Sequence, residues 1–460
     1  MHPSKERRIL TIRRYALNFM MILLLCAVLF GVPVCSRFTG FTPGILPLFS
    51  NNWQPSPDSR TLWVIMSSCG LTLFACTWTA VPPDIPRLGE GVVVVTVRRL
   101  LLMFVAYFAP ELMAAWAAWQ LICARQVAKD FNDVLGAQRA AAQPNGDCEA
   151  APQSSPAVVL PNAVSKSNES SSAGWTETHG FFAGMGGFLL YVDGKPWATL
   201  TPDELLRFVC EGSVEMPVIT KADIEDRSKG DVLSRCITIL QLGWFFIQII
   251  ARYGQHLPTT LLELDTLAVV LLTIDTYGLL WWRKPKDVQR PHIVHWNPNF
   301  PPPHECLAND KRRTPILLSV LFNRKVRRSH TSARNMTTFL AGGGSGVLFA
   351  AMHTLGWNFV FPSHAERILW RMSFVGKAGL SLTMWSLWYL DTRPSEYKGL
   401  SGKALYFLSV NLMKIIGVLG VIYILARFAI ITLIMLSLRS LPQGVYDTIA
   451  WTKFIPHVGT

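Results

Sequence analysis

Apolar runs about as long as a lipid bilayer is thick are the feature that most constrains the fold of this chain. A helix needs about 20 predominantly apolar residues to cross the hydrocarbon core of a membrane. Runs near this length predict an all-α polytopic membrane protein with about seven or eight transmembrane helices. The runs are Tyr15–Val34, Thr61–Val81, Leu100–Cys123, Ser234–Tyr253, Leu261–Trp282, Thr338–Phe361, Ile368–Leu390 and Leu405–Leu425, the last with a possible continuation over Arg427–Leu438.

Composition agrees with this fold class. Of the 460 residues, 50% are hydrophobic and only 16% are charged, whereas soluble domains carry about 25% charged residues. Much of the net charge of +13 lies in the N-terminus and in the loop Arg283–Arg334. Basic loops beside membrane spans usually face the cytosol or anionic headgroups. We therefore expect the lipid bilayer as a partner, and no nucleic acid.

The chain divides into segments by composition. Residues 1–34 are a signal-anchor or a signal peptide, and the length of the apolar core favours the anchor. Two transmembrane helices follow in 61–123, then a disordered linker in 135–173 that is rich in Ala, Ser, Gln and Asn. A small polar domain in 174–230 separates the third and fourth helices. The remaining segments are a transmembrane hairpin in 231–282, a basic Pro-rich loop in 283–337, three transmembrane helices with a C-terminal extension in 338–438, and a tail in 439–460.

Two helix starts carry a capping-box pattern, in which a Thr is followed three residues later by Glu. Thr201 and Glu204 form one in the polar domain, and Thr260 and Glu263 form the other. Asp265 also falls in this first turn, where the helix dipole favours a carboxylate. We interpret both Glu263 and Asp265 as interfacial capping residues.

The orientation of the large loops stays open. Counting spans from a cytosolic N-terminus puts the loops 124–233 and 283–337 outside, yet the second is strongly basic, which favours the cytosol. The sequons at Asn168 and Asn335 fit a lumenal side and a glycoprotein. We expect an integral membrane protein of the endoplasmic reticulum or another endomembrane.

Ionisable residues inside the apolar runs are the main candidates for function. Asp275 lies in Leu261–Trp282, and Glu111 follows Pro110 in Leu100–Cys123. Such residues are costly in a membrane and usually mark a functional site. Lys377 and Lys414 are possible counter-ions. Two interpretations remain: an ion pair that fastens helices, or acids that transfer a proton, either along a transport pathway or as catalysts acting on a lipophilic substrate.

The polar domain offers a second candidate, since His179 and Glu177 could work as an acid–base pair. The alternative is that His179 is a structural group with satisfied hydrogen bonds. The Pro-rich loop contains His292, His295, His304 and Cys306, but their irregular spacing does not predict zinc. We expect no metal and no cofactor. The glycines of 341–346 favour close helix packing.

Several segments of the chain have a familiar sequence, namely Cys76–Pro82, Ala109–Leu112, His179–Phe188, Glu225–Asp231, Trp281–Pro285, Leu441–Gly444 and Trp451–His457. In these segments the chain resembles a large, mostly uncharacterised group of fungal polytopic membrane proteins. The resemblance covers nearly all of the chain except the linker, and implies a fungal origin and a shared fold. A weaker analogy links the chain to fungal membrane-bound terpene and meroterpenoid cyclases, although no cyclase motif matches residue by residue.

Two functions follow as hypotheses. The first is a membrane-embedded enzyme of fungal secondary metabolism, an acid-catalysed cyclase or isomerase of a prenylated substrate with Glu111 and Asp275 as its acids. Tryptophans in and beside the spans could then stabilise a cationic intermediate. The second is a non-enzymatic transporter or sensor with structural ion pairs inside the membrane. The sequence shows no internal inverted repeat of the kind many transporters have, which favours the enzyme.

Overall fold

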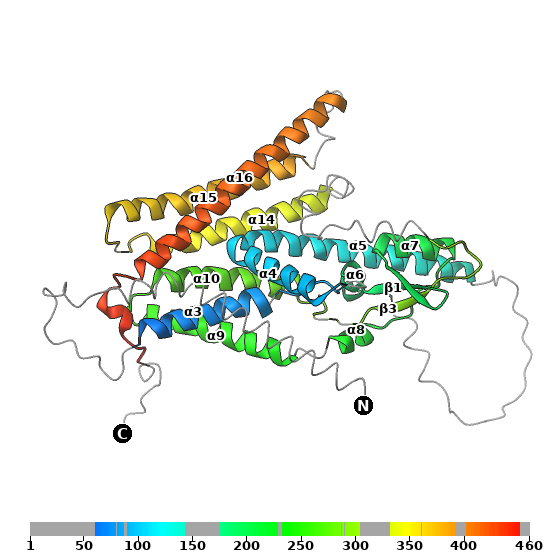
Figure 1. The fold of residues 1–460 in the computed structure, drawn as a ribbon, viewed down its shortest axis with the longest axis horizontal. Coiled ribbons are helices and arrows are strands. Elements are labelled where there is room, and N and C mark those ends of the chain that lie inside the picture. Colours follow the sequence, from blue (N-terminus) through cyan, green and yellow to red (C-terminus); the bar gives the residue numbers. More distant parts are fainter. Residues whose placement is uncertain are drawn as a thin grey trace, which may run out of the picture.

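The computed structural model describes residues 60–79, 81–86, 90–142, 174–228, 232–286, 288, 290–303, 332–359, 361–391 and 402–450. The predictions for residues 1–34, for Asn168 and for 304–331 lie outside this part of the chain. Figure 1 shows a bundle of long helices at one end and a small mixed unit at the other. The protein is mostly helical, as expected, but it is not all-α, because the small unit contains a three-stranded sheet.

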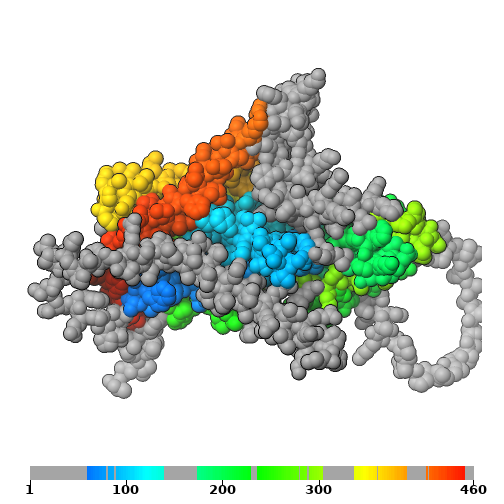
Figure 2. Space-filling model, in the orientation of Figure 1, coloured from blue at the N-terminus to red at the C-terminus, as the bar shows by residue number. Residues whose placement is uncertain are grey.

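The bundle contains long helices from both halves of the chain. Figure 2 shows α16 as an orange diagonal across one face, with the small unit in green beyond the bundle. The elements are α3 (Leu62–Phe74), the π-helix η2 (Ala75–Thr79), α4 (Val92–Phe108), α5 (Pro110–Ala142), α9 (Val232–Gly254), α10 (Leu261–Thr273), the π-helix η5 (Ile274–Leu280), α14 (Ser332–His353), η6 (Thr354–Gly356), α15 (His364–Asp391), α16 (Gly402–Ser437) and η8 (Gln443–Tyr446).

The prediction of seven or eight transmembrane helices is not supported. Among the described residues, three helices are long and apolar enough to cross a membrane, or four if a bent pair counts as one span. They lie at Cys236–Gly254, Met336–Gly356 and Lys414–Ser437, and the bent pair is α4 with α5. The apolar helix Leu62–Trp78 is too short for the test. Within the described residues the predicted apolar runs correspond to helices, but their length in the sequence overstated how many could span a bilayer.

The predicted span Leu100–Cys123 is two helices. α4 and α5 meet at an angle of 114°, and Ala109 between them leaves the helical region, with φ −138° and ψ 65°. The residue before a proline avoids the α conformation, and proline suits the first position of a new helix. Pro110 therefore ends α4 and begins α5. Glu111 consequently lies in the first turn of α5, directly after the bend between the two helices.

α10 is the central helix of the bundle. All ten residues from Leu261 to Val270 are buried, including three polar ones, and helices α3, α9, α14 and α16 pack around it. Its capping box is confirmed, since the Thr260 hydroxyl accepts from the Glu263 amide and the Glu263 carboxylate accepts from the Thr260 amide. The predicted span at Leu261–Trp282 is thus an α-helix that continues as the π-helix η5.

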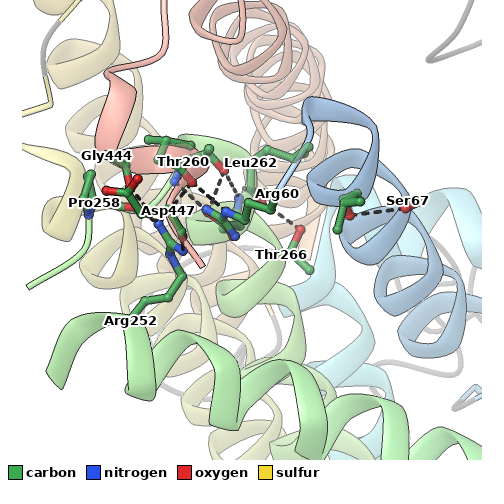
Figure 3. Close-up of polar contacts among 12 residues, drawn as sticks. Arg60, Ser67, Arg252, Pro258, Thr260, Leu262, Thr266, Gly444 and Asp447 are labelled. Carbon is green, nitrogen blue, oxygen red and sulfur yellow. Dashed lines mark hydrogen bonds and ion pairs between the residues drawn. The ribbon is translucent and has the colours of Figure 1, made fainter. Parts of the chain in front are cut away.

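A clamp of two arginines holds the C-terminal segment against the start of α10 (Figure 3). Arg60 forms a bidentate pair with Glu263 at 2.6 and 3.3 Å and donates to the Val445 carbonyl. Arg252, which is only 1% exposed, donates to the carbonyls of Pro258 and Asp447 at 2.6 and 2.8 Å. These bonds join α9, α10 and η8, although their residues lie far apart in the sequence.

The small unit is built on the second half of α5. Figure 1 shows α5 running out of the bundle and along α6 and α7. Residues 135–142, which we expected in the disordered linker, are the last turns of this helix; residues 143–173 lie outside the described chain. The remaining elements of the unit are α6 (Glu177–Gly184), β1 (Phe188–Val192), β2 (Lys195–Thr199), α7 (Pro202–Glu211), α8 (Lys221–Arg227) and β3 (His292–His295).

The sheet has the order β2-β1-β3. β1 and β2 form a hairpin through Asp193 and Gly194, both with positive φ (50° and 73°), which is the turn that Asp-Gly favours. β3 pairs with β1 in parallel and comes from the segment that we expected to be a loop. The small unit is therefore completed by β3, whose residues follow the transmembrane hairpin predicted in 231–282. The second capping box, Thr201 with Glu204, is confirmed at the start of α7.

Close contact between α5 and α6 fixes the small unit to the bundle. The rings of Phe131 and Trp175 stack with centroids 3.8 Å apart, and Asn132 exchanges two hydrogen bonds with the backbone of Trp175. Gly180 approaches so closely that a Cβ atom there would lie 2.0 Å from the Ala124 carbonyl oxygen. This position therefore requires glycine.

We predict that Gly180→Ala separates α6 from α5 and lowers the free energy of unfolding of the small unit. Overpacking of this kind costs about 1–3 kcal/mol, and limited proteolysis of the purified protein would detect the loosened unit. Gly184→Ala in the same helix is the matched control, because a Cβ there meets no atom within 4 Å. Equal protease resistance of the two variants would contradict the prediction.

Candidate functional site

Glu111 begins the candidate site, at the point where the chain turns from α4 into α5. Its side chain is buried, with 1% exposure, and neither carboxyl oxygen has a hydrogen-bond partner among the described residues. The Tyr423 hydroxyl contacts the carboxyl group, and the Lys377 ammonium lies near enough to interact with it electrostatically. Because buried carboxyl groups nearly always have well-formed hydrogen bonds, an acid with only these looser contacts is unusual.

Lys377, from α15, is the base beside Glu111. It is also 1% exposed, and its Nζ has no hydrogen-bond partner among the described residues. Its surroundings are aromatic: Nζ lies 3.7 Å from the ring centroid of Phe349 and 5.0 Å from that of Tyr423. Lys414, the other predicted counter-ion, is exposed on α16. The structure therefore brings Glu111 next to Lys377.

Glycines of α14 make this meeting of helices possible. A Cβ at Gly342 would lie 2.4 Å from the Trp385 ring, and one at Gly346 would lie 2.1 Å from Ser381 Oγ and 3.8 Å from Glu111 Cγ. The expected packing role of this segment is thus confirmed. Without side chains at these two positions, α5 and α15 both pack directly on the α14 backbone.

Asp275, the other predicted acid, lies beside the same turn of α14. It belongs to the π-helix η5, a kind of distortion found often at functional sites. Its carboxyl group is half-buried and interacts with the Ser345 hydroxyl. Ser345 directly precedes Gly346, so both predicted acids face adjacent residues of α14, but each has its own neighbours.

Asp265 has a role that sequence reasoning missed. It does not cap α10; it is completely buried and accepts two hydrogen bonds from Arg427, at 2.6 and 3.1 Å. His353 Nε2 lies 3.0 Å from the same carboxylate, and the Tyr107 hydroxyl also contacts it. Asp265 therefore joins α4, α10, α14 and α16 in one closed network.

His353 completes this network through both ring nitrogens. Nδ1 lies 2.7 Å from the Phe349 carbonyl oxygen, and Nε2 faces Asp265. Both neighbours are hydrogen-bond acceptors. The signal that could have revealed the network was present in the sequence, because Arg427 and His353 both interrupt strongly apolar segments. We interpreted Arg427 only as the start of a helix extension, whereas α16 runs unbroken through it.

His179 and Glu177 have separate partners in the small unit. His179 Nδ1 accepts from the Thr176 amide at 3.1 Å, and Nε2 lies 2.9 Å from the Ile219 carbonyl, so Nε2 carries the proton. Glu177 instead forms ion pairs with Arg125 at 2.8 Å and Arg283 at 2.7 Å. These contacts match the structural alternative for His179.

The pKa values of these two groups follow from their contacts. Burial lowers the pKa of the His179 imidazole, and this outweighs the hydrogen bond to Ile219, which raises it. Partial burial raises the pKa of the Glu177 carboxyl, but the hydrogen bonds from Arg125 and Arg283 outweigh burial and bring that pKa below its ordinary value. His179 is thus held neutral and Glu177 ionised.

The candidate zinc ligands do not form a described site. His292 and His295 lie on β3, where His292 contacts Arg227 and the ring of Phe188. His304 and Cys306 lie outside the described residues. Within the described ranges, no three His, Cys, Asp or Glu side chains are grouped so that they could hold a metal ion.

Comparison with known proteins shows the family of this chain. A family model described as a family of unknown function (DUF8562) matches residues 45–300, which is more than half of the chain. The match includes Glu111, Asp265 and Asp275, whereas Lys377 and Arg427 lie beyond it. Neither the curated proteins nor the solved structures gave a match.

We predict that Arg427→Met lowers the free energy of unfolding by about 3–5 kcal/mol, because it leaves the buried Asp265 carboxylate without its main partner. The double variant Asp265→Asn with Arg427→Met should lose less than the sum of the two single variants. Thermal unfolding in detergent would measure both. Arg439→Met, at an exposed position, is the control, and additive losses would contradict the prediction.

We also predict that acid weakens the small unit. The folded-state pKa of His179 is lowered, so the unfolded chain binds more protons below the unperturbed value of 6.5. Stability is therefore complete above about pH 6.5 and falls as the pH drops from there toward the folded-state pKa. Hydrogen exchange of α6 amides between pH 7.5 and 5.5 would measure the loss.

His179→Asn should reduce this pH dependence. His292, whose pKa burial and Arg227 also lower, supplies the part that remains. An identical pH slope in His179→Asn and the unmodified protein would contradict the assignment.

Proposed function

We propose that this chain, which belongs to the family of unknown function DUF8562, is an integral membrane enzyme that protonates a lipophilic substrate from Glu111. The observation that carries the proposal is a buried carboxyl group whose two oxygens have no hydrogen-bond partner among the described residues. The Tyr423 hydroxyl and the Lys377 ammonium interact with this group, but its oxygens keep hydrogen-bonding capacity for a substrate. A positioned carboxylic acid is a common general acid.

The reaction that we propose is the acid-catalysed cyclisation or isomerisation of a prenylated substrate, terpenoid or meroterpenoid, in fungal secondary metabolism. Protonation of an alkene or epoxide generates positive charge, which aromatic faces stabilise. The rings of Phe349 and Tyr423 lie 3.7 and 5.0 Å from Lys377 Nζ beside Glu111, so aromatic faces line this point of the bundle. An apolar bundle also excludes water, which would otherwise quench a cation. We place the enzyme in the endoplasmic reticulum or another endomembrane, where prenylated substrates dissolve.

A second candidate is a non-enzymatic membrane protein, a transporter or sensor, whose buried charges are structural. The closed network of Asp265, Arg427 and His353 favours it, because every member has a partner within the bundle. The contact between Asp275 and Ser345 favours it as well. Glu111 distinguishes the two functions, since a structural acid needs a hydrogen-bonded partner and a catalytic one needs access to substrate.

We predict that Glu111→Gln lowers the amount of product about 10²–10⁴-fold, the usual contribution of a general acid. Mass spectrometry of lipid-soluble metabolites from host cells that carry the gene or the variant would measure it. Protein abundance in the membrane fraction should stay unchanged, because Gln is nearly isosteric with Glu.

Glu215→Gln, at an exposed position in the small unit, is the matched control and should leave the metabolites unchanged. A metabolite profile that is the same for Glu111→Gln, for the unmodified gene and for a gene deletion would overturn the enzyme and favour the transporter or sensor.

A further inference from the structure

Lys284 and Lys377 are both almost fully buried and lie near aromatic rings, and a comparison of their contacts separates their roles. Nζ of Lys284 lies 3.2 Å from the Pro82 carbonyl oxygen, 3.1 Å from Gln120 Oε1 and 3.6 Å from Asp84. These oxygens are what a permanent ammonium group requires when it leaves water. Nζ of Lys377 has no such acceptor at hydrogen-bond distance among the described residues.

Lys377 instead has the surroundings of a reactive amine. A lysine that is desolvated among apolar groups is the kind that attacks carbonyl compounds, because the neutral amine is its nucleophilic form. Phe349 and Tyr423 supply the apolar walls. Ser381, one turn further along α15, is also buried, and its Oγ has no partner among the described residues.

Glu111 supplies the acid and base that such an amine needs. It comes from a different helix, α5, and its carboxyl group is buried near Nζ, in contact with the Tyr423 hydroxyl. Gly346 admits both Ser381 and Glu111 to this point, since a side chain there would collide with Ser381. An amine, a carboxyl group and a hydroxyl group therefore meet beside the aromatic rings of Phe349 and Tyr423.

We infer that Lys377 forms an imine with a lipophilic aldehyde or ketone, with Glu111 as its proton partner. This inference rests on the proposed function, because it names the class of carbonyl compound that the same buried site would bind. Ser381 can donate a hydrogen bond to the carbonyl oxygen of such a compound.

The chemistry balances without an oxidant or a reductant. Neutral Nζ attacks the carbonyl carbon, a C–N bond forms, and the oxygen takes a proton from Glu111. The nitrogen then returns one proton to the Glu111 carboxylate. Glu111 next protonates the hydroxyl group, which leaves as water while the C=N bond forms. The products are a protonated imine, one water molecule and a Glu111 carboxylate, which is the counter-ion of the imine.

The test uses the full chain in membranes and farnesal, a prenyl aldehyde, as the probe. Sodium borohydride reduces any imine to a stable amine, and peptide mass spectrometry locates it. We expect the farnesyl adduct on Lys377, and a rate of labelling about tenfold or more lower in Glu111→Gln. Lys377→Arg should remove the adduct, whereas Lys414→Arg, at an exposed position on α16, should leave it unchanged.

Labelling confined to exposed lysines such as Lys195 and Lys221 would overturn the inference. Peptide mass spectrometry of the labelled, unmodified protein distinguishes these outcomes even if Lys377→Arg does not fold. The two proposals fail separately. An adduct on Lys377 together with unchanged metabolites in Glu111→Gln would overturn the proposed enzyme alone. Lost metabolites without an adduct would overturn the imine alone.

Discussion

The ion pair between Asp265 and Arg427 is the interaction on which the packing of the bundle depends. Asp265 lies on the central helix, completely buried, so its charge must be matched from the helices around it. Arg427, His353 and Tyr107 match it from α16, α14 and α4. An unpaired charge at this depth would cost several kcal/mol. The pairing therefore favours one arrangement of these four helices over arrangements that bury the same apolar surface.

That arrangement positions the candidate site. Phe349 links the two groups of charges, because its carbonyl binds His353 while its ring faces both Arg427 and Lys377. With α14 and α16 fixed by Asp265, the glycine side of α14 is available to α5 and α15. In the network around Asp265, each charged side chain has a partner within the bundle. The neighbouring Glu111 and Lys377 lack well-formed hydrogen bonds among the described residues. This contrast is the main argument for chemistry at Glu111 and Lys377.

Local signals in the sequence predicted local structure well. The capping boxes at Thr260 and Thr201 mark true helix starts, because the bonds of a capping box lie within one turn. Pro110 marked a break for the same reason, although its consequence, a sharp turn between two helices, was larger than the kink we expected. Glu111 was found as an anomaly through its apolar context, and Lys377 was one of two bases that could have faced it.

The sequence by itself determined that this chain is mostly helical, that some of its helices are apolar enough for a membrane, and that a few ionisable residues are buried with them. Each of these depends on composition and short-range spacing. Only the tertiary structure decided that Asp265 pairs with Arg427, 162 positions away, that Lys377 and not Lys414 lies beside Glu111, and that β3 completes the sheet of the small unit. Partners so distant in sequence are chosen by how helices pack, and no local pattern contains that information.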